Sequence, residues 1–117
     1  MIYQGQEIDT KPTQEMAQEA EKGLAWREEY RRGGTLVGVA RANQLRRRDE
    51  LSIRTIKRMK AYFDRHAIDL EAPKNRDPDA EGYPGAGLIA WLLWGGDSGK
   101  AWADRKVSEI LRIEDGN

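Results

Sequence analysis

The sequence predicts an all-α fold, a compact bundle of about five short helices with a long Pro/Gly-containing loop before the fourth. Apolar residues recur at helical spacing along most of the 117-residue chain, and no alternating run predicts a strand longer than a few residues. Glycine and proline separate the periodic segments. A chain of this length has room for one hydrophobic core, so we expect a single helical domain at 13–113, an extended N-terminal arm at 1–12 and a frayed tail at 114–117.

The first predicted helix begins after Thr13, which can accept a hydrogen bond from the first turn, where the negative charge of Glu15 is also favourable. Its inward positions recur at helical spacing: Met16, Ala20, Gly23 and Leu24. Trp26 and Tyr30 form a further pair on this helix. The segment "RRGG" at 31–34 ends it, because arginine suits the last carbonyl groups and glycine adopts the left-handed cap.

Two further helices are predicted on either side of a basic connector. Thr35 can cap a short helix over 36–45, and Ser52 can cap a longer helix over 53–68. The connector between them is "RRRDEL", at 46–51. One face of the longer helix is apolar: Ile53, Ile56, Met59 and Phe63. Another face of it is basic: Arg54, Lys57, Arg58 and Arg65.

The second half of the chain predicts a loop and two more helices. Residues 69–87 contain three of the four prolines and no helical period, which predicts a long loop, either ordered or flexible. The segment "LIAWLLW" at 88–94 is apolar on every side, so we expect a short helix buried on all faces. A last helix is predicted over 99–114, with these residues inward: Ala103, Val107, Ile110 and Leu111. The expected core is rich in tryptophan: Trp26, Trp91, Trp94 and Trp102.

The composition excludes several classes of protein. The chain has no cysteine, which excludes a disulfide framework, a thiolate zinc site and a cysteine nucleophile. The sequence does not open on the basic and apolar leader that is typical of secretion. Its longest strongly apolar run, at 86–94, is less than half of a membrane span. We therefore expect a soluble, cytoplasmic protein without a membrane partner.

The segment "GGDSGK" at 95–100 raises the question of a nucleotide site. A Walker loop, G-x-x-x-x-G-K-[ST], holds phosphates and magnesium through backbone N–H groups, its lysine and its hydroxyl residue. Aligned on the Gly–Lys pair, the first glycine of the motif falls on Trp94 and its hydroxyl residue on Ala101. We therefore interpret the segment as a corner between two helices, the second of which is capped by Asp97 or Ser98.

The segment "DPDAEG" matches the first half of an EF-hand loop, in which alternate residues supply oxygen ligands to calcium before a turn glycine. The matching residues are Asp77, Asp79, Glu81 and Gly82. The position of the bidentate glutamate is Leu88, so we interpret the segment as a polar surface loop. His66 is the only histidine and, near a helix end, is expected to cap carbonyl groups or to interact with the helix dipole. We expect no catalytic residue, no cofactor, no metal site and no enzymatic activity.

Charge is unevenly distributed, although the chain is neutral overall. Nine lysines and arginines stand against three acidic residues between Arg41 and His66. A short helix, a connector and a helix with a cationic face loosely resemble a helix-turn-helix or helix-loop-helix DNA reader. The predicted nucleic-acid-binding residues are Arg46, Arg47, Arg48, Arg54, Lys57, Arg58 and Arg65. The connector lacks the turn glycine of that motif, and the competing interpretation is a basic face paired with this protein's own acidic segments or with a partner.

Three stretches of the chain resemble sequences of a known family. They are "EAEKGLAWREEYRRGGTLVGVARANQL", "SIRTIKRMKAYFDRHAIDL" and "GYPGAGLIAWLLWGGDSGKAWADRKV", and the strings "RGGT…GVARA" and "YP.AG.IAW.LWGGD" are the most specific. The family comprises small uncharacterised helical proteins encoded by phages, prophages and other mobile DNA, similar to domains found near or fused to prohead-protease genes. The resemblance covers residues 13–111, implies a compact helical module and carries over no functional residue. Relatives more often have "EV" at 67–68 and a connector that contains asparagine, so the basic connector is particular to this chain.

The residues and the resemblance together predict a small non-enzymatic phage or mobile-element accessory protein that binds nucleic acid through a basic helix-loop-helix surface. The alternative is a structural or assembly module, associated with the virion or capsid, that binds protein and has no nucleic-acid role. DNA is the partner expected from the first hypothesis, and phage structural proteins or a second copy of this chain are expected from the second. The expected location is the cytoplasm of a bacterial host or, for the alternative, the virion.

Overall fold

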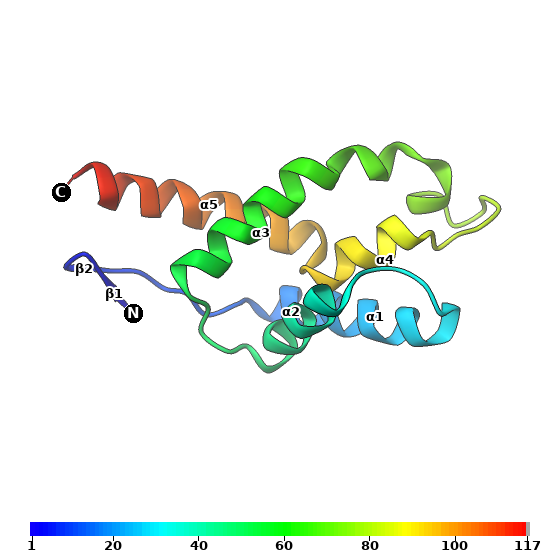
Figure 1. The fold of residues 1–117 in the computed structure, drawn as a ribbon, viewed down its shortest axis with the longest axis horizontal. Helices are drawn as coiled ribbons and strands as arrows, with labels where there is room; N and C mark the ends of the chain where they lie inside the picture. The colour runs from blue at the N-terminus through cyan, green and yellow to red at the C-terminus, as the bar shows by residue number, and fades with distance from the viewer. Residues whose placement is uncertain (117) are drawn as a thin grey trace.

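The computed structural model describes residues 1–116 and confirms the predicted all-α fold (Figure 1). Five α-helices follow a small hairpin in this part of the chain. The helices are α1 (Gln14–Tyr30), α2 (Leu36–Arg47), α3 (Ile53–His66), α4 (Ala86–Leu93) and α5 (Gly96–Asp115). The hairpin strands are β1 (Ile2–Tyr3) and β2 (Gln6–Glu7), and two 3₁₀ helices follow α3, namely η1 (Ala67–Glu71) and η2 (Pro73–Asn75).

Side-chain caps determine where the first three helices begin. Thr13, Thr35 and Ser52 are the N-cap residues, as predicted, and each side-chain oxygen accepts a hydrogen bond from the backbone N–H three residues later. α1 ends at the predicted segment, but its left-handed C-cap is Arg31 rather than a glycine, so the prediction of a glycine cap is wrong. α2 continues two residues beyond its predicted end, and Arg48 is its left-handed C-cap.

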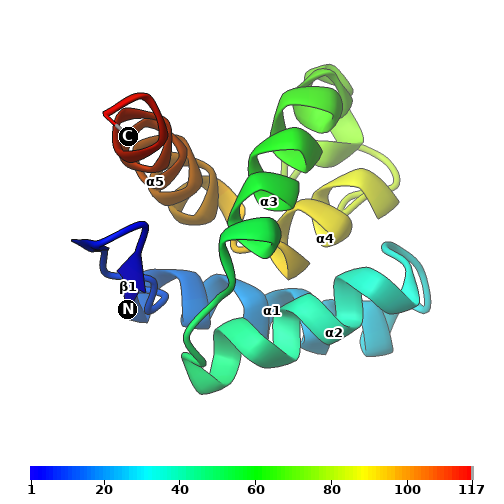
Figure 2. The same ribbon diagram turned by 60° about the vertical axis from the view of Figure 1, so that its left-hand side comes forward.

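The helices form two layers with α4 between them. α1 and α2 lie side by side in one layer, whereas α3 packs on α5 in the other (Figure 2). Each of these four helices contacts α4, although α4 is only eight residues long. The short apolar helix is therefore the centre of the fold.

α4 is buried on most of its surface but not on every side. Ile89, Leu92 and Leu93 are at most 5% exposed. α1 crosses it backbone against backbone, because a side chain at Gly23 would place its first carbon 2.8 Å from the backbone nitrogen of Leu93. Ala90 is only half-buried, so the prediction of burial on all faces is wrong for one side. On that side Ala90 lines a hollow that also has residues of α2 and α3 in its lining.

Three of the four tryptophans lie in the core, as predicted: Trp91, Trp94 and Trp102. Trp91 packs edge-on against Phe63, with ring centroids 4.8 Å apart, and donates a hydrogen bond from Nε1 to the Asp97 carboxylate at 2.9 Å. Trp26, which was also expected in the core, is instead half-buried and packs edge-on against two tyrosines. The reason is that it lies off the line of buried positions along α1.

Leu111 is a further correction, since it was predicted to face inward from α5 and is 48% exposed. The other three predicted inward residues of this helix are buried: Ala103, Val107 and Ile110. Their spacing continues to Ile113, which is half-buried against the core. Leu111 therefore lies on the solvent side of the helix.

The N-terminal arm is held against the last helix. Its two strands pair antiparallel, and Tyr3 donates a hydrogen bond from its hydroxyl to the Glu114 carboxylate at 2.6 Å. The Lys57 ammonium lies 2.8 Å from the same carboxylate oxygen. Residues 114 and 115 belong to α5, so the predicted fraying is wrong there, while Asn117 lies outside the described residues.

The loop between α3 and α4 is organised around Asn75. The Asn75 side chain is 4% exposed, donates from Nδ2 to the Asp69 carbonyl oxygen at 2.6 Å and accepts a hydrogen bond from the Leu88 backbone N–H at 3.1 Å. The two 3₁₀ helices occupy the first part of the loop. The sequence left open whether 69–87 is ordered, and these contacts show an ordered loop.

Replacing Trp91 with alanine is expected to lower the free energy of unfolding by about 3–5 kcal/mol, because it removes a ring that is 3% exposed from the core and leaves a cavity. Trp26→Ala is the matched control and should cost clearly less, since that ring is half-exposed. Urea unfolding followed by circular dichroism measures both changes. Equal losses in the two variants would contradict the central place of α4.

The Glu114 contacts predict a pH-dependent stability. The pKa of Glu114 lies below its ordinary value of 4.5, because Lys57 and then Tyr3 donate hydrogen bonds to the ionised carboxylate. A lowered pKa in the folded state contributes stability above the ordinary pKa, and the contribution is lost as the pH falls through the folded value. We expect Glu114→Gln to be less stable than the wild type at neutral pH, with a difference that shrinks below about pH 4.5. Denaturant unfolding at several pH values measures this, and a pH-independent difference would contradict it.

Candidate functional site

Three of the seven predicted contact residues are held within the protein itself. Arg47 forms an ion pair with Asp49 at 3.0 Å, and Lys57 pairs with the carboxylate at the end of α5. Arg48 closes α2 and donates from Nε to the Pro12 carbonyl oxygen at 2.8 Å. The competing interpretation, in which the basic residues pair with the chain's own acidic residues, is therefore correct for Arg47 and Lys57.

The remaining arginines of α3 are free of such partners. Arg54, Arg58 and Arg65 are exposed and make no hydrogen bond or ion pair within residues 1–116. The helical period places them within about 40° of one another around the α3 axis and over about 16 Å of its length. We call these three residues the α3 arginine face. Arg46 is exposed on a different helix, where it donates to the Asn43 side chain at 3.3 Å.

α2 and α3 do not form the packed pair of a helix-turn-helix. α2 packs against α1 and α4, whereas α3 packs mainly against α5. The connector is anchored in the core by Leu51, which is 2% exposed and donates its backbone N–H to the Thr10 carbonyl oxygen at 3.1 Å. This anchor separates the two helices, so the likeness to a helix-turn-helix reader is wrong at the level of packing.

A groove of about 660 Å³ lies between α3 and the first turn of α2. Arg58 and Arg65 line one wall, and Val37 lines the opposite wall. The floor includes Ala90 of α4 and the ring of Trp94, which follows α4 directly. Two members of the α3 arginine face therefore border an apolar hollow, an arrangement typical of sites that bind organic anions.

Four side chains form a stacked column beside the groove. The guanidinium of Arg41 lies 5.2 Å from the ring centroid of Trp94, the Trp94 and Tyr62 centroids are 4.5 Å apart with planes 10° apart, and His66 lies 4.6 Å from Tyr62. At the end of the column, Nδ1 of His66 lies 2.8 Å from Oδ2 of Asp69. Burial raises the pKa of Tyr62, so its hydroxyl stays protonated.

Arg41 is a buried cation without a carboxylate partner in residues 1–116. It is 8% exposed, it donates to the Gln44 side chain, and its Nε has no hydrogen-bond partner in the described chain. Burial, and to a smaller extent the positive charge of Arg58, lower the pKa of Arg41. Its stacking on Trp94 offsets part of this desolvation. The region between α2 and α3 therefore carries positive charge that the described residues do not neutralise.

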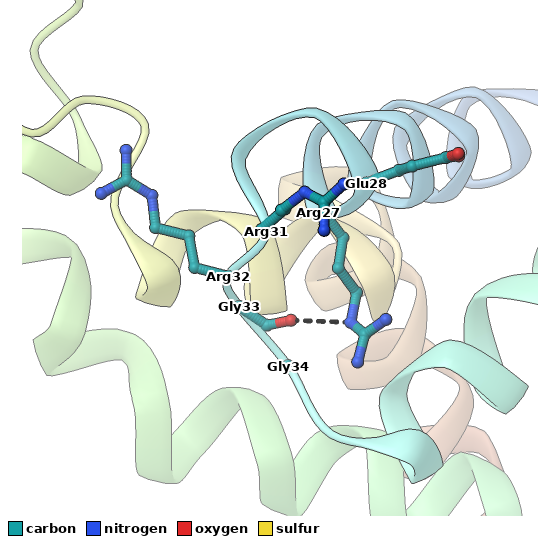
Figure 3. A pocket seen from close by; sticks show the side chains of 6 residues that line it. All are labelled: Arg27, Glu28, Arg31, Arg32, Gly33 and Gly34. Carbon is teal, nitrogen blue, oxygen red and sulfur yellow. Dashed lines mark hydrogen bonds between the residues drawn. The ribbon is translucent and has the colours of Figure 1, made fainter.

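A second depression, of about 480 Å³, lies at the end of α1 (Figure 3). Arg27 donates from Nε to the Gly33 carbonyl oxygen at 3.0 Å, whereas Arg32 points away from it and lies over the Tyr30 ring. Because these side chains diverge, they do not form a closed site. Gly34 lines both depressions, so the arginines of this turn lie next to the groove. The sequence signal for this turn is "RRGG", which predicts the helix end but not the depression.

The corner between α4 and α5 is structural. Gly95 has a φ of 110°, which favours glycine and lets the chain turn directly from one helix into the next. Neither Asp97 nor Ser98 caps α5, contrary to prediction, because α5 begins before either of them and Asp97 is used by Trp91. Lys100, the lysine that aligns with the phosphate-binding lysine of a Walker loop, forms an ion pair with Asp104 at 2.8 Å.

No three histidine, cysteine or carboxylate side chains within residues 1–116 are arranged to hold a metal ion. In the segment that matches half of an EF-hand, the Asp77 carboxylate accepts a hydrogen bond from the Asp79 backbone N–H at 2.9 Å, which is a local turn. His66 is the last residue of α3, but its ring pairs with Asp69 rather than with a carbonyl group. Each helix in the same part of the chain is too short or too polar to cross a membrane.

Comparisons of the chain with models of protein families, with curated proteins and with solved structures find no match. The resemblance to phage-encoded proteins stays a prediction.

Asn75 is a structural support of the groove that has no counterpart among the predicted residues. It holds the Asp69 carbonyl and the Leu88 N–H, and Asp69 and Gly87 border the groove. We expect Asn75→Ala to lower the free energy of unfolding by about 1–3 kcal/mol, because a buried side chain and its two hydrogen bonds to part-buried backbone groups are lost. The neighbouring exposed Lys74→Ala is the control. Unchanged denaturation midpoints in both variants would rule out this role for Asn75.

Proposed function

We propose that this protein is a small non-enzymatic accessory protein that binds nucleic acid through the α3 arginine face. The observation that carries the proposal is the alignment of three exposed arginines on one helix face, without a hydrogen-bond or ion-pair partner within residues 1–116. Their total separation of about 16 Å equals the rise of about five successive phosphates along one strand. Arginine binds phosphate bidentately and keeps its charge at every physiological pH.

The proposed interface is smaller than the one predicted from the sequence. Arg47 and Lys57 are neutralised by carboxylates, and Arg48 is committed to the Pro12 carbonyl group. Each of these side chains would have to give up an existing contact in order to bind a phosphate. We therefore expect them to contribute little, and we assign the salt-dependent part of binding to the α3 arginine face.

A second candidate function is a protein-interaction or assembly module. Leu36 and Val37 favour it, because they are 81% and 55% exposed at the start of α2 and form an uncovered apolar pair. A partner that covers this pair would not depend on salt in the way that phosphate contacts do. The origin in a phage or mobile element belongs to either proposal and rests on the sequence resemblance alone.

Titration of fluorescent single-stranded and duplex DNA at several salt concentrations tests the first function. We expect Arg54→Ala/Arg58→Ala/Arg65→Ala to lose most binding at low salt and to reduce the slope of log K against log salt by about two to three for duplex DNA. The control is Arg47→Ala/Arg105→Ala/Arg112→Ala, which removes the same charge from other surfaces. Absence of binding in the wild type at low salt, or equal losses in both triple variants, would overturn the proposal.

A further inference from the structure

The groove beside the α3 arginine face has the size of a site for one small organic group. Its volume of about 660 Å³ lies within the range of about 300–1,000 Å³ that is usual for such sites. A base inside a duplex exposes only its edges in the grooves of the DNA, so it cannot enter a hollow of this kind. An unpaired base can turn away from its strand and enter.

The lining of the groove suits the flat ring of a base. Val37 supplies apolar surface from one wall and Ala90 from the floor. In the stacked column, the faces of the Trp94 and Tyr62 rings pack against their neighbours. The edges of these two rings therefore line the groove. Ring edges carry partial positive charge and pack favourably against the electron-rich face of another ring. The Tyr62 hydroxyl has no hydrogen-bond partner within residues 1–116 and stays protonated, so it can donate to a base.

The charges around the groove suit a phosphate at its rim. Arg58 and Arg65 belong both to the groove wall and to the α3 arginine face. Arg41 adds positive charge behind Trp94, where the described residues provide no carboxylate to neutralise it. The acidic residue in the lining is Asp69, which is held by His66 at the end of the stacked column. A strand that follows the arginine face would therefore bring its phosphates to the rim and one base to the hollow.

We propose that the groove holds one unpaired nucleotide, with its phosphate on Arg58 and Arg65 and its base against Tyr62 and Trp94. The protein then prefers single-stranded to double-stranded nucleic acid. This inference rests on the proposed nucleic-acid function and names its substrate class. An acidic protein segment with an apolar side chain is the alternative occupant, and nucleic-acid binding that does not depend on the bases would leave the groove to it.

The test compares a pentadeoxynucleotide with an abasic sugar–phosphate strand of the same length and charge, and with a duplex, at one salt concentration. We expect the intact strand to bind the wild type about tenfold more tightly than the abasic strand, which is within the range found for single base contacts. Val37→Glu places a negative charge in the groove and should remove this preference. Leu36→Glu makes the same charge change at the adjacent exposed residue outside the groove lining and should preserve it.

The outcomes separate the two proposals. Equal binding of the intact and abasic strands, with binding still lost in the triple arginine variant, would overturn the groove assignment and leave the proposed function standing. Loss of the preference in both glutamate variants would also overturn the groove assignment, because it would reflect charge alone. Absence of binding to every strand at low salt would overturn the proposed function and, with it, this inference.

Discussion

Covering the apolar surface of α4 is the constraint on which the arrangement of the other helices depends. A helix of eight residues without a charged or polar face is stable only where its neighbours remove most of its surface from water. α1 meets it backbone against backbone at Gly23, and Phe63 of α3 packs against Trp91. The hydrogen bond from Trp91 to Asp97 satisfies the indole N–H that this packing buries. The surface of α4 at Ala90 is only half-buried by the neighbouring helices and forms part of the groove floor. The groove is therefore a consequence of the way the other helices pack around α4.

The same packing decides which positive charges face solvent. Two lysines of α3 lie toward α5, where Lys57 pairs with Glu114 and Lys60 pairs with Asp104. The α3 arginine face has no such partner within residues 1–116. A basic stretch that looks uniform in the sequence is therefore divided by the fold into a neutralised side and a free side. A chain with no net charge thereby keeps a local cationic surface, which is what attracts an anionic partner at low salt.

Local signals made the helices predictable, whereas the contacts that close the fold are not local. Thr13, Thr35 and Ser52 begin helices through bonds to residues three positions away, so the sequence around each of them is sufficient. The contact between Tyr3 and Glu114 joins residues 111 positions apart, and no periodicity or composition marks it. For the same reason the predicted tail was wrong at 114 and 115. An isolated helix end would fray, and a distant tyrosine and lysine hold this one.

The candidate site also has a part that local sequence signals predict and a part that depends on contacts between distant residues. The period of one helix predicts the basic face of α3, although not that Lys57 is paired elsewhere. The groove, by contrast, needs Val37, Tyr62 and Trp94 to meet from three parts of the chain. Arg41 connects the arginine face with the groove, because its buried charge lies next to Trp94 in the groove lining. Its buried charge costs free energy, its close contacts with Gln44 and Trp94 are with neutral groups, and the Asp69 carboxylate lies at the opposite end of the stacked column. The positive charge of Arg41 therefore adds to that of Arg58 and Arg65 beside the apolar groove, and this is the physical reason to expect an anionic partner there.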